Sequence, residues 1–507
     1  MRTLIAALVV ALLALVSSPA LADGGEPLAL PADLVAGEVS FPGSGGLVLH
    51  GSVVSPVGAK SGRPGVVLVH GAGTGTPREK LLGEAVAFAR QGLSVLIYDK
   101  RSEGYSLFKR SYSQLADDAL GAVGALRKQP GVDPAKVGIW GLSEGGWVAP
   151  LAASRSQDIA FAIVVGANAL HPLRQQSWAV AAGLRKAGVG GPLVERVEPN
   201  LYRVIADGGM TPEPYYDPER VLANVRQPVL GIWGVHDLLT PPRETPPIFA
   251  AALEKGGNRQ YTFRFFADAD HAAHRTPDGG VTRLPELAPG YAELVGSWVG
   301  EVTTGQAPEA QVSGPAPVQA DDSVGVPPVA WWESSGVQAA ALVLFLVAFG
   351  GYPVVAAVRR VRRRGGPPPI KVARVVSAGG LAVVLGGFAY LFYLIMTGGK
   401  LSAPGPLVAG RPLVWLVLQA LTVVTVVCTA LTVLRLRKAT TTQATTQTTT
   451  QTAPQTAPQR DDLAPRGETV RRQPEQVSRG ERVRVGVLVA GGVVLVPWAL
   501  YWGLLLP

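Results

Sequence analysis

Between residues 39 and 300, short apolar runs rich in valine and isoleucine alternate with longer stretches whose apolar positions follow a helical period. Apolar strands separated by helices are typical of a mostly parallel sheet that is covered by helices on both faces. Helices are expected, for example, at Pro77–Arg90 and Tyr112–Arg127. We therefore expect an α/β fold with one large core. The predicted strands are Leu47–Val54, Gly65–Val69, Ser94–Tyr98, Val137–Trp140, Ile159–Val165, Val229–Trp233 and Tyr261–Phe266.

The alternation stops between residues 168 and 223, where two helical stretches and the pair Tyr215-Tyr216 replace it. We interpret this segment as a cap inserted into a domain that spans residues 23–300. Residues 301–336 are rich in proline and alanine and have no periodicity, which predicts a linker.

Four long apolar runs follow, at about 337–358, 375–398, 412–434 and 485–506. Each has the roughly 20 residues that are needed to cross a bilayer. The sequence thus predicts three transmembrane helices within 337–434 and a fourth within 485–507. A basic, Thr/Gln-rich loop at 435–484 would connect them. No ionisable residue lies in the middle of a run, which disfavours a transporter or channel.

The formal net charge of +9 belongs to the C-terminal part, because acidic and basic residues nearly balance within 23–300. A nucleic-acid partner is therefore not expected. Basic residues are dense in the loop from Arg359 to Arg374 and in the loop 435–484, whereas the turn at 399–411 holds only Lys400 and Arg411. Because positive loops stay in the cytoplasm, the linker, the turn and the C-terminus are expected outside it.

The first 22 residues are typical of a secretory signal peptide. Arg2 supplies the positive start, Leu4–Val16 the apolar stretch and Ala20-Leu21-Ala22 the small-residue cleavage site. An uncleaved anchor is the alternative, and both interpretations place the following domain outside the cytoplasm. We therefore expect a multi-pass protein of the cell membrane.

Ser143 is the first candidate for chemistry. It lies in Gly-Leu-Ser-Glu-Gly, between the predicted strand Val137–Trp140 and a helical stretch that begins near Glu144. A sharp turn from strand to helix lifts a serine hydroxyl off the sheet, and small residues at Gly141 and Gly145 make room for it. This context favours a nucleophilic serine over an ordinary glycine-rich turn.

A serine nucleophile needs a base, and the base needs an orienting acid. Of the 6 histidines, only His271 and His274 follow the last predicted strand, and His271 is nearer to its end. Asp237 follows the preceding strand, which gives the order serine, acid, histidine. A helix cap is the alternative role for Asp237. We predict that Ser143, Asp237 and His271 form the catalytic set, with His274 as the second candidate for the base.

Donors for an oxyanion are expected from two backbone N–H groups. One is that of Glu144, directly after the nucleophile, and the other is that of Ala72 in the loop after Gly65–Val69. The side chain of Glu144 has two open roles, which are binding a substrate amine and stabilising a helix N-terminus.

Several motifs together resemble the α/β-hydrolase superfamily over residues 40–300, in its serine-esterase and prolyl-oligopeptidase-like (dienelactone-hydrolase-related) branch. The resemblance implies a Ser143, Asp237 and His271 triad, an acyl-serine intermediate and no cofactor or metal. The motifs are Val67–Gly73, Ile97–Arg101, Gly141–Trp147, Ile232–Asp237 and Ala269–His271.

The expected function is that of a membrane-tethered extracytoplasmic serine hydrolase. Its partners would be a small-molecule ester, thioester or peptide and the lipid bilayer. A membrane-anchored binding or sensor domain without turnover is the alternative, although such a module needs no complete triad.

Overall fold

The computed structural model describes residues 28–58, 60–106, 108–362, 371–398, 404–450 and 479–506, with the backbone alone for 438–450 and 479. The predicted signal peptide at 1–22 lies outside these residues, as does most of the predicted loop 435–484. The described chain divides into two compact units. One unit holds the sheet, and it takes in the chain up to Ala187 together with Glu198–Ala330. The other holds the apolar helices, and it takes in Gly188–Val197, Trp331–Met396 and Pro404–Pro507.

A 9-stranded sheet, counted over the described residues, organises the first unit in the order β1-β2-β4-β3-β5-β6-β7-β8-β9. The first two strands join β4 by antiparallel pairing, and all pairs from β4 onward are parallel. β4 lies on one side of β3 and β5 lies on the other, so the direction of the strand order reverses at β3. Ligands bind at such a reversal of strand order, beyond the carboxyl ends of the strands. The strands are β1 (Leu34–Pro42), β2 (Val48–Pro56), β3 (Arg63–Val69), β4 (Ser94–Tyr98), β5 (Val132–Leu142), β6 (Ala162–Val165), β7 (Val229–Gly234), β8 (Tyr261–Phe266) and β9 (Gln311–Ser313).

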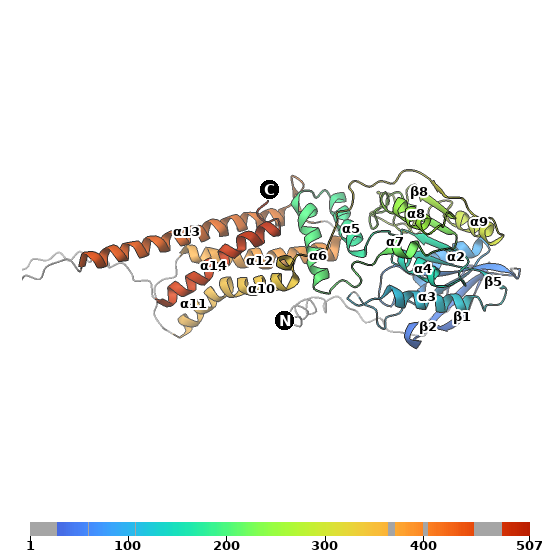
Figure 1. Cartoon of the computed structure of the whole chain (residues 1–507), viewed down its shortest axis with the longest axis horizontal. Helices are drawn as coiled ribbons and strands as arrows, with labels where there is room; N and C mark the ends of the chain where they lie inside the picture. The colour runs from blue at the N-terminus through green and yellow to red at the C-terminus, as the bar shows by residue number, and fades with distance from the viewer. Residues whose placement is uncertain are drawn as a thin grey trace, which may run out of the picture. The chain divides into compact units, whose positions relative to one another are not determined.

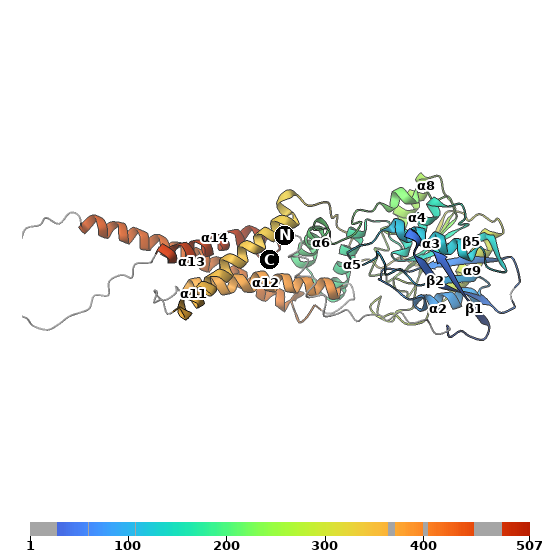
Figure 2. The same ribbon diagram turned by 90° about the horizontal axis from the view of Figure 1, so that it is seen from below.

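Helices cover both faces of this sheet. Successive side chains of a strand point to opposite faces, so each strand contributes to both of the cores that the helices cover. In β3, Val67 and Val69 join the core under α3, α4 and α8, whereas Val66 and Leu68 join the core under α2 and α9. Figures 1 and 2 show these two helical layers with the strands between them. The predicted fold class is thus confirmed. The helices are α2 (Leu82–Arg90), α3 (Tyr112–Leu126), α4 (Gly145–Arg155), α7 (Pro218–Leu222), α8 (Thr245–Lys255) and α9 (Tyr291–Thr303).

The segment 301–336, for which a linker was predicted, differs from that expectation. It contains β9, whose residue Val312 pairs with Phe263 of β8, so it extends the sheet by one strand. Further along, the N–H of Val318 donates to the carbonyl of Val235 at 2.8 Å. Glu244 accepts from the N–H of Ser323 at 2.8 Å. Residues 311–323 are therefore part of the first unit, because their backbone groups bond to it.

The expected insertion at 168–223 consists of α5 (Pro172–Lys186), a π-helical turn (Leu193–Val197), α6 (Glu198–Asp207) and α7. Its middle, Gly188–Val197, groups with the second unit. There the N–H of Gly190 donates to the carbonyl of Gly410 at 3.0 Å.

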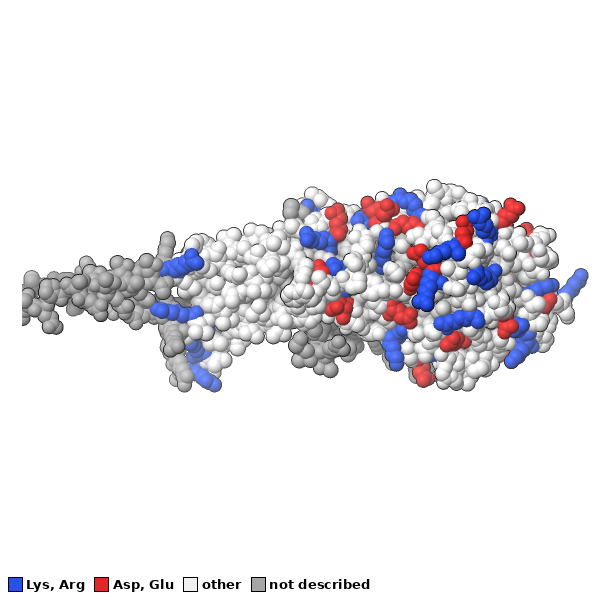
Figure 3. All heavy atoms as spheres, viewed as in Figure 1, with Lys and Arg blue, Asp and Glu red and all other residues white. Residues whose placement is uncertain are grey.

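The second unit contains 4 helices among the described residues that are long and apolar enough to cross a membrane. Their surface in Figure 3 is almost free of charged side chains, with Lys and Arg at one end. The helices are the continuous pair α10–α11 (Ser335–Val361), α12 (Lys371–Gly398), α13 (Leu413–Thr450) and α14 (Arg479–Tyr501).

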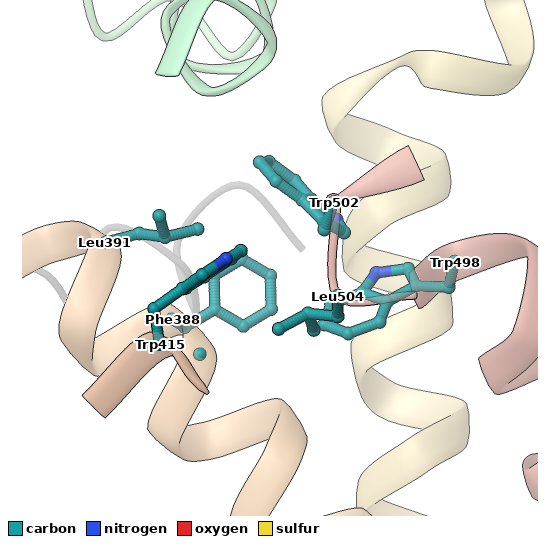
Figure 4. Close-up of a pocket in the computed structure, with 7 residues that line it drawn as sticks. Phe388, Leu391, Trp415, Trp498, Trp502 and Leu504 are labelled. Atoms are coloured by element: carbon teal, nitrogen blue, oxygen red, sulfur yellow. The ribbon is translucent and has the colours of Figure 1, made fainter. Parts of the chain in front are cut away.

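Aromatic side chains fill one end of these helices and line a small pocket (Figure 4). The indole N–H groups of Trp498 and Trp502 both donate to the side-chain oxygen of Gln338 at 3.1 Å. The buried side-chain oxygen of Gln338 thus has hydrogen-bond donors within an apolar bundle, as most buried polar atoms do. The pocket is lined by Gly387, Phe388, Leu391, Trp415, Trp498, Trp502 and Leu504.

Candidate active site

Ser143 occupies a sharp turn between β5 and α4. Its backbone is left-handed, with φ 56, which is uncommon for a residue other than glycine. A Cβ at Gly141 would lie 2.0 Å from the carbonyl oxygen of Gly145, and a Cβ at Gly145 would lie 2.5 Å from that of Val69. The turn is therefore this tight only because both neighbours are glycine. The strained serine has the geometry that the sequence predicted for a nucleophile.

Asp237 and His271 form a buried pair beyond the ends of β7 and β8. Nδ1 of His271 lies 2.9 Å from Oδ2 and 3.0 Å from Oδ1 of Asp237. Oδ1 also accepts from the N–H groups of Leu239 and Thr240, and Oδ2 accepts from the Thr240 hydroxyl. A carboxylate can only accept, so Nδ1 carries the proton and the lone pair lies on Nε2.

Nε2 of His271 is buried, and it has no hydrogen-bond partner within the described part of the chain. Buried polar atoms without a partner are rare in proteins, so each one needs an explanation. At this position, a hydroxyl brought to Nε2 during a reaction would supply the missing partner. This nitrogen is the only base-competent atom that the Asp237–His271 pair presents. It is therefore the atom that can accept a proton from a hydroxyl.

The imidazole and the serine are both adjacent to the end of β6. The N–H of Ser143 donates to the carbonyl of Val165 at 2.9 Å. A Cβ at the next residue, Gly166, would lie 2.7 Å from Nδ1 of His271. Glycine at 166 thus allows the ring to rest against the same strand end to which the serine turn is bonded.

His274, the second candidate for the base, has different partners. Its Nε2 lies 3.2 Å from Glu84 of α2, and its Nδ1 lies 3.1 Å from the carbonyl of Leu284. Burial lowers the pKa of His274, but its hydrogen bond with Glu84 and the charge of that residue outweigh burial and raise it. The geometry thus brings His271, and not His274, to Asp237.

His70 follows the end of β3 and bonds to the neighbouring strand β4. Its Nε2 lies 2.8 Å from the carbonyl of Tyr98. Because a carbonyl oxygen can only accept, this nitrogen is protonated and donates. Burial lowers the pKa of His70 to about 4, so the ring is neutral near pH 7.

The loop after β3 passes beside the serine. A Cβ at Gly71 would lie 3.3 Å from the Cβ of Ser143. Ala72 follows Gly71, and its N–H shares a peptide group with the Gly71 carbonyl. Glu144 directly follows the serine and precedes the first residue of α4. The two predicted oxyanion donors are thus carried by segments adjacent to Ser143.

The side chain of Glu144 lies in a buried polar cluster that the sequence analysis missed. Its Oε2 accepts from the Tyr105 hydroxyl at 2.6 Å and from Nζ of Lys100 at 3.2 Å. Arg110 lies 3.6 Å from the same oxygen. Burial lowers the pKa of Lys100, and the charge of Glu144 opposes this change. Oε2 of Glu144 thus pairs with cations of the chain, whereas its Oε1 is buried without a hydrogen-bond partner among the described residues.

Within the described residues, there is no group of three or more His, Cys, Asp or Glu side chains that could hold a metal ion.

A mostly parallel sheet with a strained serine after one strand and an Asp–His pair after two others defines the α/β-hydrolase fold. Residues 88–284 match the sequence model of the prolyl oligopeptidase family. The resemblance inferred from the sequence motifs is thus confirmed.

The chain is similar over short stretches to curated proteins. It is 32% identical over 139 residues to a polyketide transferase of Penicillium crustosum, covering 25% of this chain and 43% of that protein. It is 35% identical over 114 residues to a thiohydrolase of Aspergillus aculeatus, covering 22% and 34%. The chain thus spans less than half the length of these relatives.

Solved structures of the same fold are more distant in sequence. A dienelactone hydrolase from Anabaena variabilis is 20% identical, with a TM-score of 0.32, and the match covers 54% of this chain and 98% of that one. An acylaminoacyl peptidase from Pyrococcus horikoshii is 20% identical, with a TM-score of 0.35, and the match covers 47% and 38%.

Proposed function

We propose that the protein is a membrane-tethered serine hydrolase that cleaves esters, thioesters or short peptides through an acyl-serine intermediate. The observation that carries this proposal is the buried Asp237–His271 pair, whose Nε2 has no hydrogen-bond partner among the described residues, the Ser143 hydroxyl included. Ser143 is held at a positive φ, and its N–H bonds to Val165 at the strand end against which the imidazole lies. A binding module needs neither feature.

The reaction would begin when Nε2 of His271 takes the proton of the Ser143 hydroxyl while the serine oxygen attacks the substrate carbonyl. The carbonyl oxygen becomes an oxyanion that the N–H groups of Ala72 and Glu144 stabilise. Collapse breaks the bond to the leaving group, which takes the proton from His271. Water then attacks the acyl-serine by the same route, which regenerates the enzyme.

The substrate class is an acyl group on an alcohol, a thiol or an amine. The polyketide transferase and the thiohydrolase among the relatives have names that refer to acyl-group chemistry of this kind. A thioester is therefore included among the candidate substrates.

The membrane location rests on the four apolar helices and on the charges of their loops. Basic residues such as Arg359 and Arg360 occupy the last turn of α11, which favours a cytoplasmic position for that end. The hydrolase domain is proposed to face the outside of the membrane, in agreement with the N-terminal leader.

A membrane-impermeant fluorophosphonate probe tests both aspects on intact cells that produce the full chain. The native protein is expected to be labelled, since the probe reacts with an activated serine and stays outside. Ser143→Ala is expected to abolish labelling. Ser154→Ala, on helix α4 of the same domain, is the matched control and should label like the native protein, because its hydroxyl only donates to the carbonyl of Leu151.

Labelling that appears only after cells are broken would overturn the proposed orientation but leave the enzyme intact. Labelling or ester turnover that persists in Ser143→Ala would overturn the proposed nucleophile.

A further inference from the structure

Lys100 makes three hydrogen bonds at the start of the loop that follows β4. Its ammonium donates to the carbonyl of Gly71 at 2.6 Å, to Oε2 of Glu144 at 3.2 Å and to the Tyr105 hydroxyl at 3.3 Å. An ammonium has three N–H donors, so these acceptors match its full capacity. The Lys100 side chain is only 5% exposed, and that of Glu144 is 1% exposed.

The contact with Gly71 bears on the proposed oxyanion site because of peptide geometry. The carbonyl of Gly71 and the N–H of Ala72 belong to one planar trans peptide group, in which they point in opposite directions. A cation fixed on the carbonyl side therefore fixes the direction of the N–H. It also polarises the group, because linked hydrogen bonds strengthen one another.

The next turn of the loop is bonded to the same cluster. The N–H of Gly73 donates to the Tyr105 hydroxyl at 3.3 Å, and this hydroxyl donates to Glu144 at 2.6 Å. The peptide groups on both sides of Ala72 are thus fixed by Lys100 and Tyr105. The N–H of Ala72 lies between these two anchored points.

The second donor is connected to the cluster as well. The side chain of Glu144 accepts from Lys100 and Tyr105, and its backbone N–H is the other proposed donor. One buried cluster therefore joins the loop after β3 to the start of α4. The negative charge of Glu144 balances the cation in a water-poor environment.

We propose that Lys100 is a positioning residue for the oxyanion site, which orients and polarises the Ala72 N–H through the Gly71 carbonyl while Glu144 neutralises its charge. This inference rests on the proposed function, and it adds a residue to the machinery of the same site. Lys100 itself does not touch the substrate.

Lys100→Met in the full-length protein tests this role, with p-nitrophenyl acetate as the substrate. The kcat is expected to fall by about 10- to 100-fold, less than the roughly 10²–10³-fold that loss of a donor itself produces. KM should change by less than about threefold, because the missing interaction acts on the transition state. A trifluoromethyl ketone, which forms an oxyanion on the serine, should bind more weakly by the same factor as kcat/KM falls.

Lys100→Met also leaves Glu144 without its lysine partner, so a second variant separates the two effects. In Lys100→Met/Glu144→Gln, residue 144 carries no charge that needs the lysine. The hydrogen bond from residue 100 to the Gly71 carbonyl is still absent. The double variant should stay slow. Recovery of native kcat in the double variant would show that Lys100 only neutralises Glu144, and this would overturn the inference.

Arg101→Met is the control for loss of a buried cation. Arg101 pairs with Asp118 at 2.6 Å, and both side chains are 2% exposed. Its guanidinium also donates to the carbonyls of Glu103 and Ser44, neither of which lies in the loop after β3. Arg101→Met should lower thermal stability while kcat stays within about threefold of the native value. An equal fall in kcat for Arg101→Met and Lys100→Met would also overturn the inference.

Ser143→Ala is measured in parallel to separate this inference from the proposed function. Turnover that survives in Ser143→Ala refutes the enzyme mechanism as a whole. Turnover that depends on Ser143 but is unchanged in Lys100→Met refutes only the role of Lys100.

Discussion

Asp237 holds the imidazole of His271 through both carboxylate oxygens, at 3.0 and 2.9 Å from Nδ1. The acid is completely buried, and two backbone N–H groups and one hydroxyl fix it in place. It therefore sets the tautomer and the orientation of the ring together.

Asp237→Asn is expected to reduce kcat by about 10⁴-fold, because an amide stabilises the wrong tautomer and cannot stabilise the imidazolium. His271→Ala should lose activity at least as strongly. Steady-state ester hydrolysis by the purified protein measures both variants. His274→Ala serves as the comparison and should retain turnover, so an inactive His274→Ala with an active His271→Ala would contradict the assignment.

His274 should instead contribute to stability in a pH-dependent manner. Its pKa in the folded protein lies above its ordinary value of 6.5 because of Glu84. Its contribution is therefore complete below about pH 6.5 and is lost as the pH rises through the folded pKa. Thermal unfolding between pH 5 and pH 9 should show this loss in the native protein, and His274→Gln should flatten that part of the curve. A native curve without this decline would contradict the prediction.

Glycine 141 should tolerate no side chain. An added Cβ would meet the backbone oxygen of Gly145 at 2.0 Å, and backbone cannot move aside without opening the serine turn. Gly141→Ala is expected to abolish fluorophosphonate labelling of Ser143 and to lower the unfolding temperature. Gly124→Ala is the matched control, since an added Cβ there, in the last turn of α3, meets nothing within 4 Å.

The control substitution should stabilise the protein by about 0.5–1 kcal/mol, the usual gain from glycine to alanine inside a helix. Equal labelling of the two alanine variants would show that the serine turn does not depend on Gly141.

Glu244 should anchor the segment that follows β9. Its carboxylate accepts from the N–H of Ser323 at 2.8 Å and from the Gln319 side chain at 2.6 Å. Glu244→Ala leaves a buried N–H unsatisfied, which costs about 1–3 kcal/mol. Limited proteolysis should then cut within residues 311–330 much faster than in the native protein.

Asp322→Ala is the control for that experiment. Asp322 is 71% exposed and pairs with Arg243 at the surface, so its removal should change stability by less than about 0.5 kcal/mol. Similar cleavage rates for the two variants would show that Glu244 is not an anchor.

The buried strands were predictable, whereas the edge strands were not. Ser94–Tyr98 and Tyr261–Phe266 have the predicted bounds, because both are short, mostly buried runs rich in β-branched and aromatic residues. β1 was missed because most of its residues are exposed or half-buried and do not form an apolar run. β9 was missed because it has three residues and depends on pairing with β8.

The candidate site was partly predictable for a related reason. Ser143, Asp237 and His271 each follow a recognisable strand, so the order along the chain was sufficient to select them. The cluster around Glu144 was not selected, because its partners are 39 and 44 residues away in sequence. The one available signal was Lys100, a basic residue two positions after the end of the apolar strand β4.

Gly188–Val197 belongs to the helical unit, although the chain on both sides of it belongs to the sheet unit. The polypeptide therefore passes between the units on each side of this segment and again after Ala330. A protease that cuts once near residue 330 would nick the chain without separating the two units. Separation would also take a cut on each side of this ten-residue stretch, or its extraction from the apolar helices.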